Sequence, residues 1–260
     1  MKRVKLVVAY DGTNYCGWQV QPNGITIEGV LNRELSNLLK EDIVVIGASR
    51  TDSGVHSYGN VAVFDTNARM PAEKVSYALN QRLPDDIVVQ NSSEIPLDWH
   101  PRHCNSRKTY EYRILNREFP MPQRRLDTWF VYRKLNIPAM CAAAKQYEGT
   151  HDFKSFCSVN TAVEDTTRTI YSCELKQDGE LLTIRITGSG FLYNMVRIIA
   201  GTLIEIGLHR RSADAFTEAF RTLDRLSLGV TAPPHGLELT KVYYPEEAFR
   251  MPEAVRWHEE

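Results

Sequence analysis

The sequence predicts an α+β fold made of two similar halves, with antiparallel sheets lying side by side around a central cleft. Alternating apolar runs typical of strands are interleaved with longer runs in which apolar residues recur at helical spacing. These runs follow the order β-α-β-β-α-β twice, which is the split βαβ or ferredoxin-like order. The 260 residues suit one large domain or two of ordinary size. We place the division near Asn105, so that the halves comprise residues 1–105 and 106–260.

The N-terminal half is expected to hold four strands and two helices. Its first helix follows from apolar residues at helical spacing, such as Ile27, Val30 and Leu31. Its second helix begins at Pro71, because the first turn of a helix accepts proline. The expected strands cover residues 3–9, 43–47, 60–65 and 86–90, and the first helix covers residues 26–40.

The C-terminal half repeats this order. The turn at Gln177, Asp178 and Gly179 predicts a hairpin between two strands, and Gly149 is expected to end a helix. The expected strands cover residues 109–115, 167–176, 181–187 and 237–243, and the expected helices cover residues 139–147, 192–206 and 213–223. We also expect a strand at Trp129 and Phe130, and we assign these two aromatic residues to the core together with Phe153 and Phe156.

Composition and charge restrict the classes of function. No apolar run approaches the length that a membrane span needs, and the five cysteines form no Cys-x-x-Cys pair and no zinc spacing. We therefore expect a cytoplasmic protein with free thiols, no metal and no membrane partner. The net charge is −1, yet residues 101–134 contain nine Lys and Arg residues and only three acidic residues. This distribution is compatible with a basic surface that binds phosphates.

Residues 47–57 read Gly-Ala-Ser-Arg-Thr-Asp-Ser-Gly-Val-His-Ser and lie between two expected strands. Their small side chains let the backbone turn sharply and approach a ligand. Arg50, Asp52 and His56 stand in this turn, and a carboxylate at the end of a sheet can reach into a cleft. The alternative is a surface turn in which Asp52 caps backbone amides and Arg50 is solvated.

The same segment resembles the signature of the tRNA pseudouridine synthase A family, which reads close to G-A-G-R-T-D-x-G-V-H. Other segments resemble the family's motifs in the family's order and span nearly the whole chain. They are YDGTNYCGWQVQ at 10–21, YALNQRLP at 77–84, HPR at 100–102 with KTYEY at 108–112, GFLYNMVR at 190–197 and GLEL at 236–239. The chain departs from the family pattern at Tyr15, Glu28, Ser49, Ser53 and Pro101.

The resemblance implies an isomerase that converts uridine in tRNA to pseudouridine without a cofactor. It implies that Asp52 is the catalytic carboxylate, acting by attack at C1′, by addition at C6 or by removal of a sugar proton. Tyr110 is implied to stack on the target base, with its hydroxyl a candidate for proton transfer. Arg197 is implied to pair with Asp52, and an arginine buried in an apolar helix needs such a partner. The alternatives are core packing for Tyr110, which shares its strand parity with Tyr112, and solvent exposure for Arg197.

A uridine within a stem must leave its stack before an enzyme can reach it. Arg50 is expected to fill the vacated space or hold a phosphate. His56 is a candidate to assist there, although a histidine that closes a loop is more often structural. The other expected RNA contacts suit recognition of the backbone and shape of A-form RNA, and they are Arg102, Arg107, Lys108, Arg124, Arg125, Trp18 and Tyr15.

The resemblance further implies a homodimer whose subunits share one tRNA. Its implied targets are uridines 38, 39 and 40 of the anticodon stem-loop. A tRNA-binding protein that remodels its partner without catalysis is an alternative, which the intact Arg50, Asp52, Tyr110 and Arg197 argue against. The same chemistry at another RNA position is a second alternative, which Ser49 and Ser53 leave open.

Overall fold

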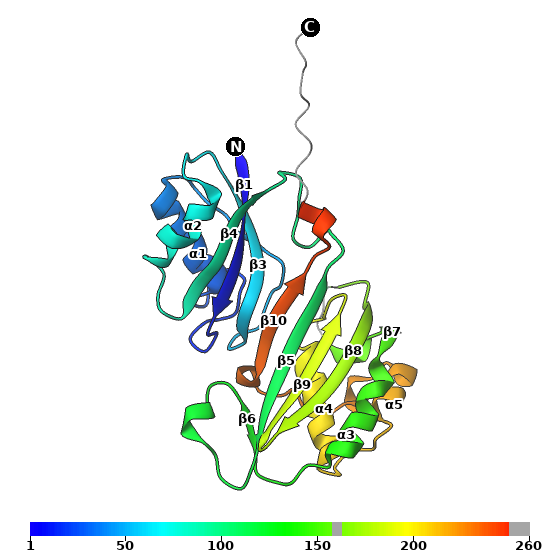
Figure 1. Ribbon diagram of the computed structural model, residues 1–260. Coiled ribbons are helices and arrows are strands. Elements are labelled where there is room, and N and C mark those ends of the chain that lie inside the picture. The colour runs from blue at the N-terminus through cyan, green and yellow to red at the C-terminus, as the bar shows by residue number, and fades with distance from the viewer. Residues whose placement is uncertain (158–162, 250–260) are drawn as a thin grey trace.

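The computed structural model describes residues 1–157 and 163–249, and the described strands form one mixed sheet (Figure 1). The strands are β1 (Lys2–Tyr10), β2 (Ile46–Gly47), β3 (His56–Thr66), β4 (Ile87–Ile95), β5 (Arg107–Asn116), β6 (Trp129–Val131), β7 (Gly149–Asp152), β8 (Thr167–Asp178), β9 (Leu181–Gly188) and β10 (Leu237–Tyr243). The helices are α1 (Ile27–Leu39), α2 (Ala72–Asn80), α3 (Ile137–Ala144), α4 (Met195–Gly207) and α5 (Ala215–Thr222). The expected α+β class is confirmed.

A short parallel pairing joins the strands of the two halves. The sheet runs in the order β4-β1-β3-β10-β5-β9-β8-β7, with β2 paired to β3 and β6 paired to β5. Glu238 and Leu239 of β10 pair with His56 and Ser57 of β3, and β10 also pairs antiparallel with β5. The two halves therefore share one continuous sheet, where the sequence had indicated two sheets side by side.

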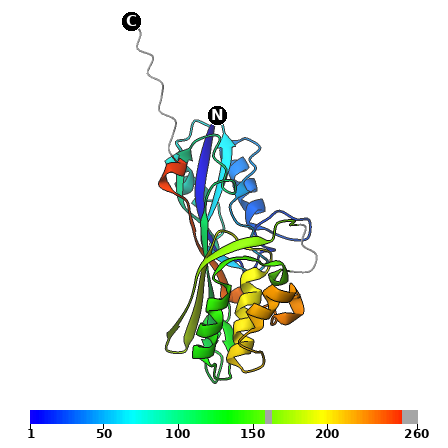
Figure 2. The same ribbon diagram turned by 90° about the vertical axis from the view of Figure 1, so that its right-hand side faces the viewer.

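The helices lie on one side of this sheet (Figure 2). Tyr10 pairs with Ser57, Ser57 pairs with Leu239, and Leu239 pairs with Tyr110, so these four side chains point to the same face. Helices α1 and α2 cover that face in the N-terminal half, and α3 and α4 cover it in the C-terminal half. We call the opposite side the helix-free face. It carries Glu111, Arg113, Arg185 and Glu238.

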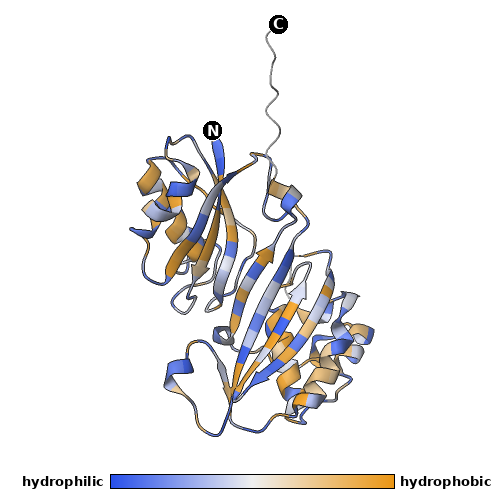
Figure 3. Ribbon diagram, viewed as in Figure 1, coloured by the Kyte–Doolittle hydropathy of each residue, from blue (hydrophilic) through white to orange (hydrophobic). Residues whose placement is uncertain are grey.

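Two apolar clusters form between the sheet and the helices. One contains α1, α2 and the strands β1, β3 and β4, and it includes the fully buried Leu31 and Leu35. The other lies between the C-terminal strands and α3 to α5, and it includes Phe153 and Phe156, which are fully buried as expected. Figure 3 shows the matching alternation of hydrophilic and hydrophobic residues along β5, β8 and β9. Each such large side chain stabilises the fold by about 1.5–3 kcal/mol.

The strand expected at residues 43–47 is reduced to β2. The N–H of Ile43 donates to Ser36 Oγ at 2.9 Å, and the N–H of Val45 donates to Asn32 Oδ1 at 2.8 Å. Polar side chains of α1 thus take the backbone donors that a strand partner would have taken. The segment follows the helix until residue 46.

Helix α4 begins three residues later than expected. Asn194, its N-cap, has a left-handed backbone with φ 62°, so the preceding residues approach the helix as a turn. This start places Arg197 in the first turn of α4. The short strand β7 was not predicted, because its four residues, Gly-Thr-His-Asp, carry no apolar alternation.

No helix in residues 1–157 and 163–249 has the length and apolar character needed to cross a membrane.

Candidate active site

Asp52 lies in the loop between β2 and β3, and hydrogen bonds hold this loop against the N-terminal half. The Asn60 side chain makes two hydrogen bonds to the Ser49 backbone. Its Nδ2 donates to the Ser49 carbonyl at 2.9 Å, and its Oδ1 accepts from the Ser49 N–H at 3.2 Å. The carbonyl of Thr51 accepts the Trp18 N–H at 3.1 Å. The loop therefore presents Asp52 from a backbone that is already ordered.

The approach of residue 17 to this loop requires glycine. Gly17 has φ 84°, and a Cβ added there would lie 2.6 Å from the Thr51 carbonyl oxygen. Gly54 has φ 76° in the turn after Asp52, where the Val55 N–H donates to the Asp52 carbonyl at 3.2 Å. These two glycines explain how the chain reverses within a few residues of the carboxylate.

The carboxylate of Asp52 meets Arg197 from the other half of the chain. Arg197 Nη1 lies 3.2 Å from Asp52 Oδ2 and 2.7 Å from Asn194 Oδ1, and Arg197 Nε donates to the Ala232 carbonyl at 2.7 Å. Both side chains of the ion pair are largely buried, with 15% of Arg197 and 13% of Asp52 exposed. Arg197 is therefore fixed by three oxygens, of which only one belongs to Asp52.

Two opposing effects act on the pKa of Asp52. Burial raises this pKa above the ordinary aspartate value, and the charge and hydrogen bond of Arg197 lower it. Burial is the larger effect, so the net direction is upward. Arg197 thus limits a shift that would otherwise favour the protonated, unreactive form of the carboxyl group.

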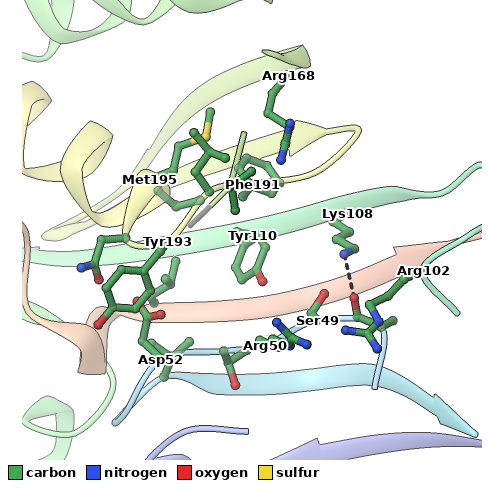
Figure 4. A pocket seen from close by; sticks show the side chains of 18 residues that line it. Ser49, Arg50, Asp52, Arg102, Lys108, Tyr110, Arg168, Phe191, Tyr193 and Met195 are labelled. Atoms are coloured by element: carbon green, nitrogen blue, oxygen red, sulfur yellow. Dashed lines mark hydrogen bonds between the residues drawn. The ribbon is translucent and has the colours of Figure 1, made fainter. Parts of the chain in front are cut away.

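A pocket of about 490 Å³ opens beside Asp52 (Figure 4). Its walls are the loop 48–52, the start of β5 and the segment 191–196 before and into α4. Tyr110 stands in the middle of the pocket, and its ring meets Phe191 edge-on with centroids 5.2 Å apart. Burial raises the pKa of Tyr110 well above its ordinary value, so the phenol is protonated at neutral pH.

Basic side chains line the part of the pocket remote from Asp52. Lys108 Nζ donates to the Ala48 carbonyl at 2.8 Å, and Arg102 and Arg168 lie nearby (Figure 4). Arg50 also lines the pocket, and it is exposed at the loop. The structure thus brings together Arg50, Asp52, Arg102, Lys108, Tyr110 and Arg197 from the set that the sequence indicated.

His56 lies outside this pocket. It is 8% exposed, and its ring nitrogens are occupied. Its Nδ1 accepts the Gly12 N–H at 3.1 Å and lies 3.0 Å from Asp11, and its Nε2 lies 2.8 Å from the Leu126 carbonyl. The structure therefore favours the structural alternative for His56 over a contact with RNA.

The other expected RNA contacts also lie outside the pocket. Arg107 stacks over the Tyr171 ring at 4.7 Å, and Arg124 pairs with Asp127 at 2.8 Å. Arg125 donates to the Pro122 carbonyl at 3.2 Å. The expectation for Trp18 and Tyr15 is corrected, because they are 1% and 6% exposed and pack in the N-terminal core, where RNA cannot reach them.

Among the described residues, no group of three or more His, Cys, Asp and Glu side chains could hold a metal ion.

Comparison with known proteins decides the family. The family described as tRNA pseudouridine synthase matches residues 6–103 and 143–245. The chain belongs to the tRNA pseudouridine synthase family. Its relatives in this family include a protein named tRNA pseudouridine synthase A from Thermoanaerobacter sp. strain X514, which is 45% identical over 94% of this chain and 100% of its own length. Another of the same name, from Citrifermentans bemidjiense, is 46% identical over 95% of this chain and 99% of its own.

Solved structures show a much weaker likeness. The archaeal box H/ACA sRNP Nop10-Cbf5 complex matches with a TM-score of 0.30 at 14% identity, covering 78% of this chain and 42% of that chain. That score is too low to carry an argument. The assignment to the tRNA pseudouridine synthase family depends on the sequence matches alone.

Phe191, Tyr193 and Arg168 line the pocket but were not singled out by sequence. Phe191 and Tyr193 stand within the GFLYNMVR motif, where only Arg197 drew attention as a charge in an apolar helix. Arg168 lies in an alternating strand with no motif around it, so no sequence signal marked it. Spatial convergence alone identifies Arg168.

Proposed function

We propose that this protein isomerises uridine to pseudouridine in tRNA, with Asp52 as the catalytic carboxylate. The observation that supports this most directly is the buried Asp52–Arg197 pair at the wall of a pocket that also contains Tyr110. A carboxylate in such a place can act on the sugar–base linkage of a nucleotide that enters the pocket. Membership of the tRNA pseudouridine synthase family supports the reaction and its RNA substrate.

The reaction breaks the C1′–N1 bond of uridine, turns the uracil and forms a C1′–C5 bond. N1 gains a proton and C5 loses one, so product and substrate are isomers. No electrons pass to an acceptor and no water is added overall, so we propose that the enzyme needs no cofactor. Asp52 acts at C1′, at C6 or on a sugar proton, and each of these routes requires its ionised form.

Arg197 is proposed to keep Asp52 ionised and oriented. Its hydrogen bonds to the Asn194 side chain and the Ala232 carbonyl fix the guanidinium independently of the carboxylate. A preorganised cation of this kind stabilises charge without rearranging during the reaction. Arg197 is a positioning residue in this proposal.

Tyr110 is proposed to stack on the target uracil. Tyr110 lines the pocket with 8% of its surface exposed, and Phe191 meets its ring edge-on, so a flat base can rest against the exposed part of the ring. Its phenol is protonated at neutral pH and stands within the pocket, where it can exchange a proton with the base. Phe191 keeps the ring in this position.

RNA must deliver the uridine as an extruded nucleotide, at a cost of a few kcal/mol for unstacking. Arg50 is exposed at the rim, where it can fill the vacated space in the stem or hold a phosphate. Arg102 and Arg168 are proposed to contact backbone phosphates on either side of the target. Arg107, at the start of β5 beside Lys108 but outside the pocket, is a further candidate for a phosphate contact.

We propose uridines 38, 39 and 40 of the anticodon stem-loop as targets and a homodimer as the active form, both on the family resemblance. We also propose that the halves 1–105 and 106–260 are each ferredoxin-like. The order β4-β1-β3-β2 in the first half and β10-β5-β9-β8 in the second supports this, because each unit places its fourth strand beside its first. Light scattering of the purified protein tests the dimer.

The function is tested by incubating the purified protein with unmodified tRNA transcripts and mapping pseudouridine at each position. We expect conversion confined to the anticodon stem-loop. Conversion at other positions would refute the proposed targets but keep the chemistry. Absence of pseudouridine together with tight tRNA binding would refute the enzyme and favour the remodelling protein.

A further inference from the structure

Among the described residues, no carboxylate pairs with the Lys108 ammonium. It is only partly exposed, and its Nζ donates to one carbonyl oxygen, that of Ala48. No carboxylate of the described residues forms an ion pair with Lys108, Arg102 or Arg168, although all three line the same pocket. Charged groups that leave water are normally paired. The Lys108 ammonium has three N–H donors and uses one of them, so it can donate to an acceptor of a ligand in the pocket.

Ser49 adds a second unsatisfied group beside it. The residue is 4% exposed, and its Oγ makes no hydrogen bond of ordinary geometry among residues 1–157 and 163–249. It lies close enough to the Tyr110 hydroxyl to lower the pKa of that phenol against the larger effect of burial. Figure 4 shows this hydroxyl between the Tyr110 hydroxyl and the Lys108 side chain. A buried polar atom without a good hydrogen bond costs free energy, so it calls for an explanation, and at the wall of a pocket a ligand can supply one. Ser49 and Lys108 thus form a polar wall that offers a hydroxyl and an ammonium to a ligand.

The pocket places this wall opposite the catalytic carboxylate. Asp52 stands at one end, Tyr110 in the middle, and Ser49 with Lys108 at the other end (Figure 4). Uracil has a matching order of groups, because N1, which bonds to the sugar, and the C4 carbonyl lie on opposite sides of its ring. When Asp52 faces the sugar linkage and the ring lies on Tyr110, the C4 carbonyl points at the wall.

We propose that the Lys108 ammonium donates a hydrogen bond to O4 of the target uracil, and so selects uracil over cytosine and stabilises the ring when its bond to the sugar breaks. This inference rests on the proposed function. Cytosine carries an amino group at C4, which would set donor against donor at Lys108. Ser49 is a positioning residue in this proposal. Its hydroxyl lies between the Tyr110 hydroxyl and the Lys108 side chain, next to the place of the uracil C4 edge.

The same contact bears on the chemical step. When the C1′–N1 bond breaks, its electron pair stays on the uracil and is shared between N1, O2 and O4. A cation at O4 stabilises that charge most after cleavage, so it lowers the barrier more than it tightens binding. Joining C5 to C1′ then uses an electron pair of the ring, the C5 proton leaves, and N1 takes up a proton.

The test compares Lys108→Met with Lys74→Met, which removes an exposed lysine on α2 far along the sheet from the pocket. Single-turnover rates are measured on tRNA carrying uridine or 4-thiouridine at the target, because sulfur is a weaker hydrogen-bond acceptor than oxygen. We expect Lys108→Met to slow uridine conversion about 30- to 100-fold. We expect Lys74→Met to match the wild type.

The effects of the Lys108→Met substitution and of 4-thiouridine on the single-turnover rate should not be additive. The wild type should lose about 10-fold on 4-thiouridine, whereas Lys108→Met should lose less than about 2-fold, because its partner at position 4 is already gone. Equal losses in both proteins would overturn the inference. Lys108→Gln keeps a neutral donor, so its loss of rate on 4-thiouridine should lie between those of the wild type and Lys108→Met. This variant replaces Lys108→Met in the test if the Met variant has a lowered Tm.

The salt dependence of the Kd for tRNA distinguishes a Lys108 contact with the uracil from a Lys108 contact with a phosphate. We expect Lys108→Met to keep the wild-type slope of log Kd against log salt. A slope shallower by about one, with an unchanged single-turnover rate, would assign Lys108 to a phosphate and overturn the inference. Absence of product from the wild type would refute the proposed function itself, whereas normal turnover by Lys108→Met would refute only this inference.

Discussion

Two sets of basic side chains, one on each side of the sheet, differ in whether a carboxylate pairs with them. On the helix-free face, Arg113 lies 2.9 Å from Glu238 and 3.7 Å from Glu111, and Arg185 also pairs with Glu111. On the pocket side, Lys108 has no acidic partner among the described residues. Glu111 raises the pKa of Arg185, whereas burial and the charges of Arg102 and Arg168 lower the pKa of Lys108 to about 8.

The presence or absence of a carboxylate partner distinguishes cations that stabilise the fold, such as Arg113 and Arg185, from cations that are available to a ligand, such as Lys108. A cation whose charge is balanced within the protein gains little from RNA, because it would have to leave one carboxylate for another anion. A cation held without a partner keeps its full attraction for RNA. Among the described residues that line the pocket, Asp52 is the single acid, and Arg197 pairs with it. Removing each kind of group should therefore have a distinct effect.

Removal of the single acid should have the largest effect. Asp52→Asn keeps the size and much of the hydrogen bonding of the side chain but loses its charge, so we expect turnover to fall at least about 1,000-fold. The Kd for tRNA should stay within about threefold of wild type, because the pocket's cations remain. Measurable multiple turnover by this variant would contradict the role assigned to Asp52.

Removal of the compensating cation should affect stability and the pH profile together. Arg197→Ala leaves Asp52 buried and unpaired, and we expect a loss of about 3 kcal/mol at neutral pH, read from denaturant unfolding. The same change in the Asp52→Asn background should cost less, because no carboxylate is stranded there.

The sign of the pH effect follows from the active form of Asp52. Arg197 lowers the pKa of Asp52 against the larger effect of burial, so its loss raises that pKa further. The ionised form then appears only at higher pH. The acidic limb of kcat/KM should move upward in Arg197→Ala, and an unmoved limb would separate Asp52 from that titration.

The uncompensated lysine predicts the alkaline limb. If the charged Lys108 is the active form, kcat/KM should fall about 10-fold per pH unit above its pKa of about 8. The charged groups that lower its pKa are Arg102 and Arg168, and Tyr110 stays a neutral phenol through this range. Lys108→Met should lack this limb, and a limb of unchanged position in the variant would assign it to another group.

Neutralising one further cation on each face gives the smallest effects and the most direct comparison. Arg102→Gln should weaken tRNA binding several-fold and make the salt slope shallower by about one. Arg185→Gln should leave the slope unchanged and alter stability by less than about 1 kcal/mol, because its side chain is 56% exposed. Equal slopes for the two variants would show that both faces contact RNA alike.

The sequence predicted the order of elements well, because apolar periodicity and the hairpin turn at Gly179 are local signals. It overpredicted the strand at residues 43–47, since nothing local shows that Asn32 and Ser36 of α1 would bind the backbone of Ile43 and Val45. It also could not show that β3 and β10 join the halves into one sheet. That pairing involves two residues on each strand, far apart in the chain.

The site was predictable to the extent that motifs carried it. Asp52, Tyr110 and Arg197 stand in matched segments. The structure places Asp52 and Tyr110 at one pocket and Arg197 in an ion pair with Asp52. Trp18 and Tyr15 were assigned to RNA by residue type, and their burial in the N-terminal core overturns this. Arg168 escaped notice because its relation to Lys108 exists only after β5, β8 and β9 pair.

The ion pair spans 145 residues of sequence, so its two members leave the ribosome at very different times. At roughly 5–20 residues per second, Arg197 follows Asp52 by about 7–30 s. During that interval the Asp52 loop has neither its guanidinium partner nor the pocket wall formed by residues 191–196. Competence toward RNA therefore arises late in synthesis, and an N-terminal fragment released early should be inert.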